Sequence, residues 1–311
     1  ERGAAALVEL CRVSVDLWEE VAKTATEPFG FERHGLLSVY EKAASFDTAQ
    51  AGIDLVVKSG VRAERWTADE VREREPAIVG KTVGGYFFPD DAHCEPYPAV
   101  VALAAEARAA GAKFVEGTEV FGISNNGSGP RMLRTTHGDI SAERIVVATG
   151  PWSEQLGAML GMRLPVIGAK GYSLVLPKAT PHPKRSIYLI ERKVAVNPHA
   201  DALRIAGTLE LVRNDFSINQ RRVDVIVRGA KGMLNIGDAP VAREVWRGLR
   251  PCTPDGMPVI GQARGRGDVW LATGHQMAGL KTATGTGLLL AQLMTKEPPR
   301  FDPAPFRADR Y

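Results

Sequence analysis

The stretch from Trp246 to Gly287 restricts the possible folds of this chain more than any other part of the sequence. It contains a strand that carries Arg250, a turn rich in proline and glycine, and two apolar strands at residues 258–261 and 269–272. A helix with a glycine-lined start follows directly. Strands that lead through a glycine-rich turn into a helix are typical of ligand sites in α/β proteins, so we expect a binding site here.

The predicted helix start favours a flat or negatively charged ligand. Gly274 and Gly279 let the backbone approach a ligand closely, while unpaired N–H groups and the helix dipole favour negative charge. Arg250 stands just before a proline and offers a planar fork of donors that suits a carboxylate, which lysine could not imitate. Together these residues predict a small acid held over a cofactor.

Four short motifs are spread along the chain, and each occurs once. They are Gly-Leu-Arg250-Pro with Thr-Pro-Asp-Gly, Ala-Thr-Gly274-His with its glycine-rich helix, Val-Ala-Thr-Gly150-Pro-Trp, and Lys-Gly-Tyr172-Ser. This set resembles the FAD-dependent D-amino acid dehydrogenase, glycine oxidase and sarcosine oxidase (DAO) family, and the resemblance covers nearly the whole chain. It implies a mixed α/β (α+β) fold, with a Rossmann-type FAD-binding domain and an antiparallel-sheet substrate domain.

The sequence departs from the family in one respect. The family begins with a strand, a Gly-x-Gly-x-x-Gly turn and a helix, which together hold the pyrophosphate of FAD. The Gly-x-Gly triplets of this chain, at 127–129, 265–267 and 285–287, lack the third glycine and do not open a helix after a strand. We therefore expect an N-terminally truncated FAD-binding domain whose first βαβ unit is missing.

Composition indicates a globular chain without a nucleic-acid role. Its 311 residues are 44% hydrophobic, and the formal charge of +3 comes from scattered basic residues. Cys11, Cys94 and Cys252 show no C-x-x-C spacing, so no disulfide framework or metal site is predicted. No apolar run reaches the roughly 18 residues of a membrane span, and no signal peptide is recognised. We expect a cytoplasmic protein, with peripheral association at the inner membrane face as the alternative.

Periodicity and turn residues predict the remaining elements. Helices are expected from Leu7 to a stop at Pro28 and Gly30, at 47–58, after a capping box at Thr67–Glu70, at 97–110, after Gly150 and at 219–234. Strands are expected at 31–40, 84–88, 113–115, 119–124, 132–136, 140–148, 171–176, 186–190, 193–197, 203–208 and 242–250, with an Asn-Gly-Ser-Gly turn at 126–129. The FAD-binding domain would comprise 1–27, 98–164 and 250–311, and the substrate-binding domain 28–97 and 165–249.

The polar loop at residues 90–96 allows two interpretations. Its carboxylates, histidine and thiol are metal-ligand types, but ligands crowded into so few loop residues rarely converge on one ion. We therefore favour a solvated loop and predict no metal.

The resemblance assigns cofactor-binding roles to two groups of residues. Val120 would meet the adenine through its backbone, and the strand-to-helix turn after residue 147 would lie beside the adenosine half, through Ala148, Thr149, Gly150 and Trp152. The flavin ring would contact Gly274, Gly279, Leu280 and Lys281. A cation at position 281 could stabilise the negative charge on the reduced ring. The alternative is structural: a sheet edge, a tight turn and a solvated lysine.

Three residues are predicted to act on the substrate. Arg250 would anchor its carboxylate, Tyr172 would close over that carboxylate, and His275 would contact the flavin or the substrate. The alternatives are a salt-bridged arginine, a core tyrosine and a hydrogen-bonded structural histidine. Cys252 near Arg250 raises covalent flavin attachment, which the preceding Pro251 and the spacing disfavour.

These assignments predict an FAD-dependent enzyme that oxidises a D-amino acid or related amine to the imino acid, which hydrolyses to the keto acid. Hydride transfer to flavin needs positioning more than acid-base catalysis, and the sequence accordingly offers no catalytic triad. The expected partners are a small amino acid and an electron acceptor, either a quinone or oxygen. The alternative is a non-catalytic chain that binds no FAD alone and acts through homo-oligomerisation or a partner subunit.

Overall fold

The computed structural model of the chain describes residues 2–124, 129–213 and 215–311. Its α-helices are α1 (Arg2–Thr24), α2 (Ala43–Lys58), α3 (Ala68–Arg74), α4 (Pro96–Ala109), α5 (Ser153–Met159), α6 (Gln220–Lys231) and α7 (Gly279–Thr295). Two short 3-10 helices, η1 (Gly150–Trp152) and η2 (Gln276–Ala278), precede α5 and α7, and η3 (Ala304–Phe306) and η4 (Ala308–Arg310) end the chain.

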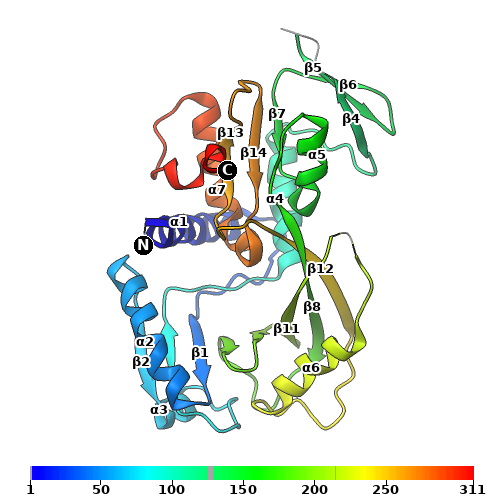
Figure 1. Cartoon of the computed structure of the whole chain (residues 1–311). Coiled ribbons are helices and arrows are strands. Elements are labelled where there is room, and N and C mark those ends of the chain that lie inside the picture. Colours follow the sequence, from blue (N-terminus) through cyan, green and yellow to red (C-terminus); the bar gives the residue numbers. More distant parts are fainter. Residues whose placement is uncertain (1, 125–128, 214) are drawn as a thin grey trace.

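The lower half of the molecule is built around one large sheet (Figure 1). Its strand order is β12-β8-β11-β10-β9-β1-β3-β2, and every pairing is antiparallel except that of β1 with β9. The strands are β1 (Leu36–Tyr40), β2 (Glu64–Thr67), β3 (Gly84–Phe88), β8 (Ile167–Pro177), β9 (Ser186–Leu189), β10 (Val194–Pro198), β11 (Ala202–Leu211) and β12 (Glu244–Cys252). We call this part, residues 36–88 and 167–252, the sheet lobe.

One face of the large sheet carries the main hydrophobic core. Alternate residues of β8, Tyr172, Leu174 and Leu176, pack there with Val223 and Ile226 of α6. Burial of alternate apolar residues follows from the two-residue repeat of a strand, and it supplies the main driving force for folding of this lobe. The opposite face of β8 turns toward the rest of the molecule.

The upper half contains two small sheets and the two longest helices (Figure 1). One sheet has the order β13-β14-β7, from β13 (Val259–Gln262), β14 (Val269–Thr273) and β7 (Ile145–Val147). The other has the order β4-β5-β6, from β4 (Val120–Ser124), β5 (Arg131–Thr135) and β6 (Ile140–Ala142). Helix α1 packs along α7, where the Ser14 hydroxyl accepts a hydrogen bond from the Gly285 N–H at 3.1 Å.

The mixed α/β fold with its antiparallel sheet confirms the predicted fold class, and the division into two domains stays a prediction. The capping box is confirmed: the Glu70 N–H donates to the Thr67 hydroxyl, and the Thr67 N–H donates to the Glu70 carboxylate. Strand 84–88 is confirmed with the predicted bounds.

Three predicted strands were wrong in whole or in part. Residues 113–115 form no strand, because no ladder partner lies beside them among the described residues, and Val115 is 60% exposed. Residues 31–35 precede β1, since Gly35 takes a φ of +80°. The segment 140–148 divides into β6 and β7.

Strand β7 is less buried than its apolar sequence suggested. It pairs in parallel with β14, and Ile145 and Val147 are buried, but Val146 is 39% exposed. The reason is that Val146 points to the opposite face of the strand from Ile145 and Val147, which both belong to an apolar cluster. The predicted turn at 126–129 falls largely outside the described residues. No described helix is long and apolar enough to cross a membrane.

Candidate active site

The predicted glycine-rich helix start is a sharp turn between β14 and α7. Gly274 has a φ of +77°, and a Cβ there would lie 2.5 Å from the Thr253 side chain, so only glycine fits. No side-chain cap bonds to the first turn of α7. A helix start without a side-chain cap can offer N–H groups to a ligand or to solvent. We call residues 274–281 the α7 entrance.

A second turn, at residues 253–257, lies beside the α7 entrance. The Thr253 hydroxyl donates to the Met257 carbonyl at 2.8 Å, and the Asp255 carboxylate accepts from the Met257 N–H at 3.0 Å. Arg310 also donates to Asp255 at 2.7 Å. Desolvation by partial burial raises the pKa of Asp255, but the hydrogen bonds that its carboxylate accepts from Arg310, Tyr311 and the Met257 N–H outweigh this and hold the pKa far below its usual value. The Thr-Pro-Asp-Gly motif thus fixes the backbone that follows Arg250.

Arg250 lies on the face of β12 opposite the main core. Its guanidinium fills the space above Gly171 on β8, where a Cβ would stand 2.0 Å from its Nη1. Nη1 donates to the Thr208 carbonyl at 3.2 Å. Desolvation by burial lowers its pKa, and no acidic side chain lies within 4.0 Å of it among the residues described. A half-buried cation without an anionic partner is costly, which indicates a site for an anionic ligand.

The strand that carries Arg250 also contacts the α7 entrance. Helices η1 and η2 both pack on β12, and η2 belongs to the α7 entrance. The structure therefore brings Arg250, the turn at Gly274 and the start of α7 into one region, at the junction of the two halves of the molecule (Figure 1).

Tyr172 lies on the other face of β8. It is 1% exposed in the main core, and its hydroxyl donates to Glu210 at 2.7 Å. Residues one apart on a strand face opposite sides, so Gly171 borders Arg250 and Tyr172 does not. The prediction that Tyr172 closes over the substrate is not compatible with this position, and the core alternative describes it.

His275 is held as a neutral side chain. Its Nε2 lies 3.0 Å from the Thr286 hydroxyl of α7. Burial lowers its pKa to about 4, since no acidic side chain in the described part of the chain offsets the desolvation of the charged ring. At neutral pH it therefore shapes the α7 entrance as an uncharged hydrogen-bonding group.

The low pKa of His275 predicts a specific pH dependence of stability. A histidine in the unfolded chain has a pKa near 6.5, whereas that of folded His275 is about 4. Between these two pH values the unfolded chain binds a proton that the folded chain does not, so the free energy of unfolding falls as the pH drops from 6.5 toward 4. We expect this group to remove about 2 to 3 kcal/mol of unfolding free energy between pH 7 and pH 4.5. Urea denaturation of the wild type and His275→Asn at both pH values measures it. An identical pH-dependent loss in the variant would contradict the assignment.

The residues assigned to the adenosine half lie in two separate sheets. Val120 begins β4, whereas Ala148 and Thr149 follow β7 and are exposed. Gly150 takes a φ of +54° and starts η1, as the predicted strand-to-helix turn requires. Trp152 stacks on Phe216 of the sheet lobe at 6.0 Å between ring centroids, so it already has an aromatic partner.

Residues 279–281 project to different sides of the α7 entrance. Gly279 begins the helix, and the Leu280 carbonyl accepts a hydrogen bond from the Trp18 indole at 3.0 Å. Lys281 is exposed and lines two neighbouring cavities, one of about 730 Å³ and one of about 250 Å³. Both cavities also share Leu7 and Ala278, so Lys281 stands where they meet.

Sequence reasoning missed Gly171 and Asp91. Gly171 was part of a recognised motif, but only the pairing of β8 with β12 shows that it makes room for Arg250. Asp91 was placed in a solvated loop, yet desolvation by burial raises its pKa, and the residue lines the larger cavity together with Lys281. The described residues contain no cluster of three or more metal-ligating side chains.

These residues fit one end of a flavin cofactor. The glycine turn, the uncapped helix start and Lys281 suit the electron-rich pyrimidine side of an isoalloxazine ring, while Arg250 stays free for a substrate carboxylate. No Gly-x-Gly-x-x-Gly turn for the pyrophosphate occurs within these 311 residues. The fold and the site together are of the type found in flavin-dependent oxidoreductases.

Comparisons with known proteins agree with this class. The profile of the family described as FAD dependent oxidoreductase (DAO) matches residues 1–293. The chain belongs to this family, whose cofactor is FAD. It is 33% identical to a D-amino-acid oxidase of Bradyrhizobium diazoefficiens, over 100% of this chain and 74% of that protein. It is 34% identical to a D-amino acid dehydrogenase of Paramagnetospirillum magneticum, over 85% of this chain and 64% of that protein.

Solved structures give the same result for the fold. Glycine oxidase from Geobacillus kaustophilus superposes with a TM-score of 0.90 at 27% identity, covering 99% of this chain and 82% of that one. L-proline dehydrogenase from P. horikoshii superposes with a TM-score of 0.86 at 22% identity, covering 97% and 83%, and shows the fold alone. This chain spans 64% to 83% of the length of the four proteins described here, so each of them contains residues that this chain does not match.

Proposed function

We propose that this protein oxidises a D-amino acid, or a closely related amine, to the imino acid with FAD as the immediate acceptor. The half-buried guanidinium of Arg250, without an acidic partner among the described residues, carries the proposal. It stands beside the α7 entrance and presents donors to a carboxylate, the group that all amino acids share.

The residues of this chain bind and orient the substrate. When bound, FAD accepts the α-hydrogen and its electron pair from the substrate as a hydride. Arg250 fixes the carboxylate, which sets the position of the α-carbon, and the start of α7 with Lys281 favours negative charge on the ring. His275 stays uncharged and adds no competing cation.

The preference for the D-enantiomer is supported by sequence rather than by fold. The two relatives described above, at 33% and 34% identity, are named D-amino-acid oxidase and D-amino acid dehydrogenase. Structures of the same fold include proteins named L-proline dehydrogenase and L-amino acid deaminase, so the fold alone accommodates either hand. The D-preference therefore depends on side chains at the site.

A second candidate is a chain that binds no FAD by itself and acts with another subunit or a second copy. Two observations favour it. These 311 residues contain no pyrophosphate-binding glycine turn, and β7 has one free edge among the described strands. A free parallel edge can pair with a strand from another chain.

Visible spectroscopy tests both candidates. The purified chain is titrated with FAD, and a bound flavin is recognised by a structured absorption band and quenched fluorescence. Anaerobic addition of D-alanine, D-leucine or D-phenylalanine should then bleach that band, and the L-enantiomers should bleach it much more slowly. A chain that never binds FAD favours the second candidate, and a bound flavin that no amino acid reduces contradicts the first.

A further inference from the structure

Two side chains of β12 converge on the same pair of glycines. Gly248 of β12 and Gly171 of β8 are cross-strand partners in the large sheet. A Cβ at Gly171 would lie 2.0 Å from Nη1 of Arg250, and a Cβ at Gly248 would lie 2.0 Å from Cη2 of the Trp246 indole. Cross-strand partners point to the same face of a sheet, with Cα atoms about 4.5 to 5.5 Å apart. The indole therefore stands beside the guanidinium that the proposed function assigns to the substrate carboxylate.

The indole of Trp246 has a face to offer to a ligand. Trp246 is 50% exposed and belongs to none of the apolar clusters formed by the described residues. Trp152, in contrast, stacks on Phe216. A half-exposed indole beside a cation that lacks an acidic partner in the described part of the chain is a surface that an amphipathic acid can cover.

The floor next to the indole is made of small side chains. Ser173 of β8 is the cross-strand partner of Trp246, and Ala206 of β11 is the partner of Ser173, so both share the face of the glycine pair. Ser173 is 6% exposed, and its hydroxyl has no hydrogen-bond partner among the residues described. A buried hydroxyl without a partner is costly, which points to a ligand or a water at this face.

The position of the α7 entrance sets the direction of the substrate side chain. Helix η2 packs on β12, and a Cβ at Gly274 would contact Thr253, the residue that follows this strand. The entrance thus lies at the carboxyl end of β12, whereas Trp246 lies on the amino-terminal side of Arg250. Because the α-hydrogen must point to the flavin ring at the entrance, the side chain on the same carbon points away from it, toward Trp246.

We infer that Trp246 is a specificity-determining residue, which selects amino acids with a large apolar side chain, above all an aromatic one. The inference rests on the proposed function. The substrate side chain lies over Gly248 and against the indole, where ring-to-ring contact adds to the burial of apolar surface. The single methyl group of D-alanine is too short to cover the indole while its carboxylate is held by Arg250.

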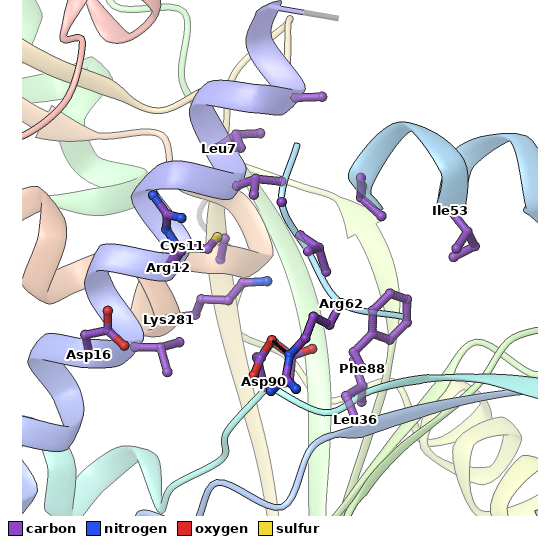
Figure 2. A pocket seen from close by; sticks show the side chains of 18 of the residues that line it. Leu7, Cys11, Arg12, Asp16, Leu36, Ile53, Arg62, Phe88, Asp90 and Lys281 are labelled. Carbon is purple, nitrogen blue, oxygen red and sulfur yellow. Dashed lines mark hydrogen bonds and ion pairs between the residues drawn. The ribbon is translucent and has the colours of Figure 1, made fainter. Parts of the chain in front are cut away.

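This face of the sheet is separate from the larger cavity. Figure 2 shows that cavity, which is a cleft between α1, α2 and the ends of β1 and β3, with Lys281 at its inner end. Neither Arg250 nor Trp246 lines it. Recognition of the substrate side chain by Trp246 is therefore independent of what the cavity binds.

Binding of two acids that cannot be oxidised tests the inference. The probes are 3-phenylpropionate and propionate, which are phenylalanine and alanine without the amine and differ only by a phenyl group. Isothermal titration into the chain with FAD present should show that 3-phenylpropionate binds at least about tenfold more tightly. Trp246→Ala should reduce this ratio to less than about twofold, and Trp246→Phe, which keeps a flat apolar wall, should retain most of it.

Gly248→Ala tests the geometry without removing the indole. The added methyl group would occupy the place of Cη2 of Trp246, so the ring must swing aside and the ratio should fall as it does in Trp246→Ala. Phe114→Leu is the matched control, because Phe114 is 46% exposed and lies outside the large sheet. This variant should keep the ratio of the wild type. Far-UV circular dichroism checks that each variant folds.

Arg250→Met separates this inference from the proposed function, since it should abolish the binding of both acids. If both acids bind through Arg250 but with equal affinity, or if Trp246→Ala weakens both equally, the inference is overturned and the proposed function stands. Binding of neither acid, or binding that does not depend on Arg250, would contradict the carboxylate anchor and so count against the proposed function as well.

Discussion

Replacing Arg250 with methionine will lower kcat/KM for D-amino acid oxidation by about 10³-fold in the FAD-bound protein. The change removes the charged fork while keeping a long side chain above Gly171. Loss of one partner of a partly buried ion pair costs about 3 to 5 kcal/mol, and about 4 kcal/mol corresponds to that factor. Steady-state kinetics with dichlorophenolindophenol as acceptor provide the measurement.

Two further variants show whether the effect belongs to the guanidinium. Arg250→Lys keeps the charge but loses the fork, so it should recover only a small part of the activity. Arg247→Met is the matched control, because Arg247 lies on the opposite face of β12 and its Nε donates to the Phe216 carbonyl at 2.8 Å. If Arg247→Met were as inactive as Arg250→Met, the anchor would be misplaced.

Gly285→Ala will destabilise the protein by about 2 to 3 kcal/mol, because it overfills the contact between α1 and α7. A Cβ at this position would lie 2.4 Å from the Ser14 hydroxyl and 3.0 Å from the Leu10 side chain. Both residues are fully buried on α1, so neither can move aside without disturbing the helix. Urea denaturation gives the unfolding free energy.

Gly287→Ala, two residues further along the same helix, should have the opposite sign. No atom lies within 4 Å of a Cβ there, and the position is exposed. Alanine is the better helix former, so we expect stabilisation by about 0.5 to 1 kcal/mol. Destabilisation of similar size in both variants would show that the α1–α7 contact is not as close as the structure indicates.

The elements predicted best were those whose signals are local. The capping box at Thr67, the strand Gly84–Phe88 and the glycine turn at Gly274 follow from hydrogen bonds or φ values within a few residues. The prediction of a strand at 113–115 was wrong, because a β-strand forms only where a neighbouring strand pairs with its backbone.

The candidate site divides in the same way. The sequence singled out Arg250 and the helix start by residue type and spacing, and the structure brings both into one region. The sequence did not reveal that Tyr172 faces the core while its neighbour Gly171 faces Arg250, since that depends on the register of β8 with β12.

By itself, then, the sequence determined the family, the cofactor class and the mixed α/β fold, and it singled out Arg250 as the candidate carboxylate anchor, because short motifs and periodicity encode them within single elements. Only the tertiary structure decided which side of each strand faces a ligand, why Arg250 lacks an acidic partner among the described residues, and that α1, α2 and α7 enclose an apolar cleft ending at Lys281. These features arise from contacts between residues far apart in the chain, which no local pattern specifies.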